Sequence, residues 1–150
     1  MPTPIPEPLV AWLLDTWPVA RLATLSPDGR PHLVPVVFGR HEGALWSPID
    51  GKPKSGRTPA RVRNVEHDPR VALLLDRYGA DWRLLWWIRI DARAAVVRTT
   101  SPAEASLRAK YPQYREVPLQ AGEPLWLQIE PERTASWYAS PAVLEELRGA

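Results

Sequence analysis

Five basic side chains gather in one short stretch of the chain, and no acidic residue lies between Gly51 and Val65. They are Lys52, Lys54, Arg57, Arg61 and Arg63. An apolar run at residues 44–49 precedes them, and Thr58-Pro59 predicts a helix start, with a hydroxyl N-cap and a proline at the first helical position. Loop amides, lysines and the positive end of a helix then converge on one place, which suits a phosphate. The sequence predicts an anion site here; the alternative is a basic loop that only faces solvent.

Tryptophans are the second unusual feature. Trp82, Trp86 and Trp87 crowd around the start of one expected strand. Large aromatics dominate cores and interfaces, so packing or a subunit contact is one interpretation. A flat wall for a planar ring is the other. Side chains alternate along a strand, so Trp86 and Trp87 are expected on opposite faces, with at least one of them facing a partner or a ligand.

Groups for covalent or acid–base catalysis are not evident in the sequence. The chain has no cysteine, which excludes thiolate nucleophiles and cysteine-ligated metals, and its three histidines share no ligand spacing. The sequence contains no Walker, G-x-S-x-G or H-E-x-x-H motif. We therefore expect no metal site and assign no catalytic residue; an enzyme of this kind would take its reactivity from a cofactor.

The elements that must position these residues are mainly strands. Alternation in residues 86–97, where Arg89, Asp91 and Arg93 interleave with apolar residues, predicts a strand with one charged face. Pro35 lies inside another expected strand, so that position should face a sheet edge or a bulge. The expected strands are residues 19–25, 32–38, 44–49, 70–76, 86–97, 124–130 and 134–138, with a turn at 39–43, and the expected helices are 9–17, 58–67, 101–111 and 141–148. This pattern predicts a mainly β fold, a small antiparallel barrel with peripheral helices, as one domain over residues 1–150.

The composition of the chain limits the classes of partner that it is expected to bind. The formal net charge is only +2, and the basic residues cluster in one loop instead of lining a groove, so we expect no nucleic acid. A single-strand binder, which interleaves cations with aromatics on a barrel, is kept as a minor alternative. No apolar run approaches ~18 residues and the first residues lack a basic region, so we expect no membrane span or signal peptide, and a cytoplasmic protein.

Three segments of the chain carry a resemblance to a known family. They are residues 19–38, the D-G-K-P-K-S run at residues 50–55, and residues 61–97 with their R-x-R-N-x-x-x-D-P-R-V and D-W-x-x-L-W-W patterns. Together they resemble the pyridoxamine 5'-phosphate oxidase-like superfamily, and within it the branch of probable coenzyme F420-dependent enzymes. Residues 44–49 lack the basic pattern ending in lysine of true pyridoxamine phosphate oxidases, which argues against vitamin B6 oxidation.

The resemblance implies an FMN-binding-like split β-barrel that forms a homodimer with two cofactor sites at the subunit interface. It implies a flavin or deazaflavin phosphate held by basic residues at the end of the third strand and on the next helix. The tryptophan cluster adds Trp86 as the candidate contact for the cofactor ring. Carried over by position, the phosphate-binding candidates are Lys52, Lys54, Ser55, Arg61 and Asn64. Arg57 and Arg63 are surplus to one phosphate and are candidates for the carboxylate-bearing tail of F420.

The function expected on this basis is an oxidoreductase that transfers hydride from reduced F420 to a small electrophilic organic substrate. Two alternatives stay open: an FMN-dependent reductase, and a protein that binds or stores the cofactor without turnover. The sequence does not decide between F420 and FMN.

Overall fold

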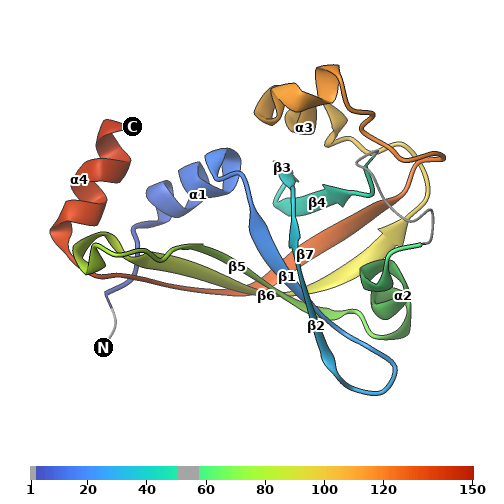
Figure 1. The fold of residues 1–150 in the computed structure, drawn as a ribbon, viewed down its shortest axis with the longest axis horizontal. Coiled ribbons are helices and arrows are strands. Elements are labelled where there is room, and N and C mark those ends of the chain that lie inside the picture. Colours follow the sequence, from blue (N-terminus) through green and yellow to red (C-terminus); the bar gives the residue numbers. More distant parts are fainter. Residues whose placement is uncertain (1–2, 51–57) are drawn as a thin grey trace.

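The computed structural model describes residues 3–50 and 58–150, and its fold is mainly β. Within these residues, seven strands form one antiparallel sheet in the order β2-β1-β5-β6-β7-β4-β3, with four α-helices around it (Figure 1). The strands are β1 Ala20–Leu25, β2 Pro31–Val36, β3 Gly39–His41, β4 Ala44–Pro48, β5 Arg70–Arg77, β6 Trp86–Val97 and β7 Trp126–Tyr138. The helices are α1 Glu7–Thr16, α2 Ala60–His67, α3 Glu104–Lys110 and α4 Pro141–Gly149, and two 3₁₀ turns, η1 Trp82–Leu84 and η2 Pro112–Arg115, complete the elements.

The long strands separate two ends of the molecule. Figure 1 shows α1 and α4 at one end of β5, β6 and β7, and α2 at the other end. None of the helices in the described part of the chain is both long and apolar enough to cross a membrane.

The main core forms because β6 alternates. Ile88 and Ile90 point inward and are almost fully buried, while Arg89 and Arg93 point outward and are exposed. The inward side chains pack with those of β1 and β5 and with Leu13 of α1. The strand predicted at residues 86–97 is thus confirmed with its bounds and its two faces.

A second, smaller core lies where α3 covers β4. Trp46 of β4 and Trp126 of β7 lie edge to face, with ring centroids 6.2 Å apart. Leu107 of α3, Tyr111 and Tyr114 pack into the same cluster. This cluster fixes the end of β4 that leads to the basic stretch.

Several other predicted elements are confirmed within a few residues. The structure has α1, β1, β2, β5 and α4 where the sequence predicts them. Strand β2 is at the edge of the described sheet, and Pro35 pairs there with Arg21 of β1 on its inner side. A proline at this edge fits its missing N–H group.

The turn predicted over residues 39–43 is wrong in part. Residues Gly39–His41 form strand β3, and only Glu42 and Gly43 make the turn, with φ angles of 48° and 83°. Gly39 lies in the strand because α3 approaches it closely: a Cβ atom there would collide with the side chain of Leu107. This glycine allows close packing against a helix, although its residue type by itself indicates a turn.

The two strands predicted at residues 124–130 and 134–138 are one strand, β7. The pairing with β6 shifts register between Asp91, which faces Arg133, and Ala92, which faces Pro131. Glu132 is therefore the extra residue of a bulge, and Pro131 lies where the ladder is already interrupted.

Both middle helices begin later than predicted. In α2, Pro59 is the N-cap and no side chain caps the helix, so Thr58 does not have the predicted capping role. In α3, Ser101 accepts a 3.0 Å hydrogen bond from the amide of Ala103, and the helix starts only at Glu104.

Candidate functional site

The basic stretch connects β4 to α2. Four of its predicted site residues, Lys52, Lys54, Ser55 and Arg57, lie outside the described residues. The described walls of the site are therefore the end of β4 with Asp50 on one side and α2 on the other.

A cavity of about 290 Å³ lies at this junction. Its polar lining residues are Ser47, Asp50 and Arg61. Its apolar lining residues are Val19, Pro35, Val36, Val37 and Pro48. Ser47 donates a 2.7 Å hydrogen bond to the carbonyl of Val37, which ties β4 to the β2–β3 connection.

Arg61 is the cation of the described cavity wall. Burial lowers the pKa of its guanidinium, and the negative charge of Asp50 opposes that effect. Its Nε atom is buried and has no hydrogen-bond partner among the described residues. Buried polar groups are nearly always hydrogen-bonded. The buried N–H group of Arg61 therefore indicates that an acceptor outside the described residues takes its hydrogen bond.

Asp50 and Tyr114 are functional candidates that sequence reasoning missed. Asp50 is 2% exposed, and its Oδ2 atom accepts a 2.8 Å hydrogen bond from the hydroxyl of Tyr114. Burial first, and then this hydrogen bond to a carboxylate, raise the pKa of Tyr114 above its ordinary value. Tyr114 lies in η2, far along the chain from β4, and no local pattern in the sequence could have linked the two residues.

Helix α2 places its three predicted site residues in different surroundings. Arg61 lines the cavity, whereas Arg63 is exposed and donates a hydrogen bond to the carbonyl of Thr58. Asn64 is 3% exposed, and its Nδ2 donates a 2.9 Å hydrogen bond to Oγ1 of Thr24 on β1. The structure thus brings Arg61 to the cavity and uses the amide of Asn64 to join the helix to the sheet.

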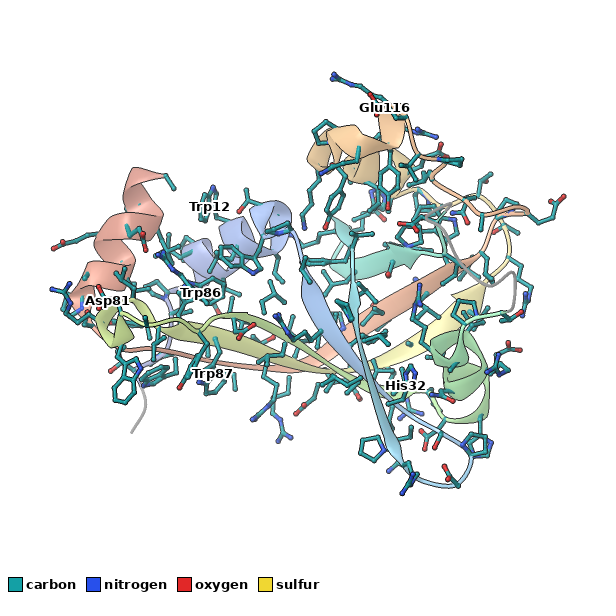
Figure 2. All side chains as sticks on the ribbon, viewed as in Figure 1. Trp12, His32, Asp81, Trp86, Trp87 and Glu116 are labelled. Carbon is teal, nitrogen blue, oxygen red and sulfur yellow. The ribbon has the colours of Figure 1, made fainter. Side chains whose placement is uncertain are left out.

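Trp86 does not lie at this site. Its side chain is fully buried, and its ring packs edge to face on Trp17, with centroids 4.8 Å apart. Figure 2 shows it beside α1, at the far end of the long strands from α2. A strand of 12 residues separates its ends by roughly 35 Å. The prediction that Trp86 is a ring contact is corrected: a ring with no exposed surface is part of the core.

The expected alternation of the tryptophan pair is confirmed. Trp87 is half-buried and lies on the face opposite to Trp86, with the guanidinium of Arg89 5.8 Å from its ring centroid (Figure 2). Trp82, in the preceding 3₁₀ turn, is 77% exposed.

The chemistry of the described cavity is that of binding. It offers a cation, a carboxylate, a hydroxyl and an apolar wall, and it places no nucleophile beside a base. The residues that the structure describes contain no group of histidine, aspartate and glutamate side chains able to hold a metal ion. An arginine beside an apolar wall can hold an anionic group and a ring together.

Three solved structures with the same fold show what kinds of protein this chain is similar to. The conserved hypothetical protein Rv2991 from Mycobacterium tuberculosis is 23% identical, with a TM-score of 0.69 over 90% of this chain and 86% of that chain. The heme storage protein HutZ from Vibrio cholerae is 18% identical, with a TM-score of 0.63 over 88% and 93%. A protein described as an F420 reductase is 19% identical, with a TM-score of 0.63 over 87% and 98%. At these identities the likeness shows the fold.

Sequence comparison supports the same assignment. No curated protein matches the chain in sequence. The family model of pyridoxamine 5'-phosphate oxidase, however, matches residues 7–138, which include every strand of the described sheet and the cavity between β4 and α2. With so much of its length matched, the chain belongs to the pyridoxamine 5'-phosphate oxidase family.

Proposed function

We propose that this chain binds a flavin-type cofactor in the cavity between β4 and α2, and that Arg61 contacts the phosphate of that cofactor. The observation that carries the proposal is the buried Nε of Arg61, which has no partner among the described residues and borders a cavity. The family assignment supports a cofactor of this class. The sequence adds Lys52, Lys54, Ser55 and Arg57 directly before α2.

The cavity residues fit such a group. A guanidinium presents several N–H donors in a fixed plane and is the preferred partner of phosphate oxygens. Helix α2 starts beside it with no acid in its first turn, so the positive end of the helix adds to the attraction. The apolar side chains that line the same cavity can cover uncharged parts of a ligand.

We propose further that the cofactor is F420 and that the reaction is reduction of a small electrophilic organic substrate. The reduced deazaflavin supplies a hydride from its C5 atom when bound. The protein contributes binding, orientation of the ring face against the substrate, and shielding from water. The described cavity needs no acid–base pair for that task. The structural neighbour described as an F420 reductase supports this choice.

Two alternatives have support of their own. An FMN-dependent reductase would use the same phosphate contacts. A protein that binds or stores a cofactor without turnover has the heme storage protein HutZ as a structural neighbour. The absence of any described catalytic pair is compatible with all three functions, so binding and turnover must be measured separately.

The assembly we propose is a homodimer of split β-barrels with two cofactor sites at the subunit interface. Trp82 and the half-buried Trp87 lie on or beside the outer face of the long strands. One exposed and one half-buried tryptophan, on or beside one face of the sheet, favour an interface with another copy of the chain. A well-folded monomer in sedimentation experiments at micromolar concentration would contradict this assembly.

The proposed function is tested by titrating the protein with F420 and with FMN, and by assaying oxidation of reduced F420 with a panel of electrophilic acceptors. Each hydrogen bond to a charged group contributes about 1.5–3 kcal/mol, so Arg61→Ala should weaken binding by about tenfold to a hundredfold. Arg148→Ala is the matched control, because Arg148 is exposed on α4 at the other end of the molecule. Equal dissociation constants for wild type and Arg61→Ala would overturn the assignment of the site, and binding without turnover would favour the storage alternative.

A further inference from the structure

A second cavity, of about 310 Å³, lies where α1 and α3 both contact β3 (Figure 1). It shares no lining residue with the cavity between β4 and α2. Its volume is at the lower end of the roughly 300–1,000 Å³ that is typical of small-molecule sites, so it can admit a small organic molecule. Its lining residues are Asp15, Gly39, Arg40, Ser106, Ala109 and Lys110.

Lys110 brings an amine to that cavity. The chain has three lysines, and Lys110 is the one that lies outside the basic stretch before α2. Its Nζ donates hydrogen bonds of 3.1 and 3.0 Å to the carbonyls of Leu14 and Phe38, and it lies 3.6 Å from the centroid of the Phe38 ring. A neutral amine has two N–H groups, which match these two acceptors, and its lone pair takes the place of the third proton.

The charged groups around Lys110 leave its amine without a carboxylate of its own. Asp15 of α1 accepts hydrogen bonds of 2.9 and 2.7 Å from Arg40 of β3, one at each carboxylate oxygen. Burial lowers the pKa of Lys110 to about 8, against the opposing effect of the Asp15 charge. Burial also raises the pKa of the adjacent Tyr111 hydroxyl to about 12, so that group stays uncharged at neutral pH. A desolvated lysine of this kind is partly neutral and therefore nucleophilic.

We propose that Lys110 is a site of covalent capture for small aldehydes that enter this cavity. The neutral nitrogen forms a bond to the carbonyl carbon while the C=O π electrons move to oxygen, and a proton passes from the nitrogen to that oxygen. The carbinolamine then loses water to leave a C=N bond. The amine and the aldehyde thus give an imine and water, with no change in oxidation state. The hydroxyl of Ser106 and the guanidinium of Arg40 line the same cavity and favour a polar aldehyde.

The test compares Lys110 with a solvent-exposed lysine in the same protein. Arg148→Lys introduces that reference, because Arg148 is exposed on α4. The variant is incubated at pH 7 with glycolaldehyde and cyanoborohydride, which reduces an imine to a stable secondary amine, and the modified peptides are quantified by mass spectrometry. Lys110 should react about tenfold faster or more than the introduced lysine, since an exposed lysine has a pKa of about 10.4 and is almost wholly charged at pH 7. At pH 10 the two rates should approach each other.

A second variant tests whether the cavity, and not the amine alone, makes the site. Ala109 is exposed on α3 and lines the cavity, so Ala109→Phe can fill the space from its rim. In the Arg148→Lys background this change should slow capture at Lys110 and leave the introduced lysine unaffected. Equal rates for the two lysines at pH 7, or a rate at Lys110 that Ala109→Phe does not change, would overturn the inference. Either result leaves the proposed function standing, because no flavin-type cofactor takes part in the experiment.

Discussion

The indole rings of Trp17 and Trp86 lie edge to face, with centroids 4.8 Å apart and an angle of 71° between their planes. This pair closes the core between the end of α1 and the start of β6. Truncating a fully buried tryptophan to alanine costs about 3–5 kcal/mol. We therefore expect Trp86→Ala to lower the free energy of unfolding in urea by that amount, with cofactor affinity unchanged in whatever fraction stays folded.

Leu33→Ala serves as the control for that change. Leu33 on β2 is 65% exposed, so its truncation should alter the free energy of unfolding by no more than about 0.5 kcal/mol. A Trp86→Ala protein of normal stability that fails to bind cofactor would restore Trp86 to the site.

Asn64 and Thr24 form a buried bridge between α2 and β1, with 2.9 Å between Nδ2 and Oγ1. Removing either partner leaves the other buried without it, which costs about 1–3 kcal/mol. Asn64→Ala and Thr24→Val should each destabilise the protein by that amount, and the double variant should lose less than the sum of the two. Strictly additive losses would show that the two side chains act independently.

Tyr111 satisfies a buried amide. Its hydroxyl accepts a 3.1 Å hydrogen bond from the N–H of Phe38 and lies 2.9 Å from the carbonyl of Pro18, as donor to it. Tyr111→Phe leaves that amide without its partner, so we expect a loss of about 1–3 kcal/mol in urea unfolding. A change below about 0.5 kcal/mol would mean that the amide finds another acceptor.

The same residue predicts a pH dependence at alkaline pH. Burial raises the pKa of Tyr111 from 10.0 to about 12, so the folded state retains a proton that the unfolded state loses between these values. The free energy of unfolding should therefore fall as pH rises through this window. Tyr111→Phe, measured in parallel, should lack that part of the decline, and parallel curves for the two proteins would contradict the prediction.

Arg63 is exposed beside the site, and we propose that it contacts the carboxylate tail of F420. Exposed ion pairs contribute about 0.2–1 kcal/mol and are screened by salt. Arg63→Ala should weaken F420 binding a few-fold at low salt and leave FMN binding unchanged, and the difference should vanish at high salt. Equal losses for the two cofactors would assign Arg63 to the shared phosphate instead.

The alternation of apolar and charged residues, and the position of a proline in an expected strand, made much of the fold predictable. Strand β6 alternates apolar and charged residues from Ile88 to Arg93, and Pro35 marks β2 as an edge strand. The errors arose where a residue serves a distant partner. Gly39 makes room for Leu107 of α3, and Pro131 lies beside the bulge residue Glu132 of its own strand, where β7 shifts register against β6. A single chain segment carries neither piece of information.

The candidate site was predictable only in part for the same reason. Arg61 could be found because basic residues cluster locally before α2. Whether other candidates lie at the site depends on their burial, which the sequence does not show. The sequence suggests that Trp86 could form the wall of a ligand site, but in the structure its side chain is part of the core. Asp50 and Tyr114 meet only because α3 folds back over β4, and pairs that depend on such long-range packing leave no periodic signal.

Strand β4 finds its sheet partners at β3 and at β7, and the β7 residues that pair with it are 126–129. Strand β4, which lines the cavity, therefore pairs with a strand, β7, that is synthesised some eighty residues later. While the chain is still emerging from the ribosome, the Trp46–Pro48 edge has only the short β3 beside it, and Tyr114 has yet to reach Asp50. The cavity can therefore form only after β7 has been synthesised, and until then β4 presents an open edge to neighbouring chains.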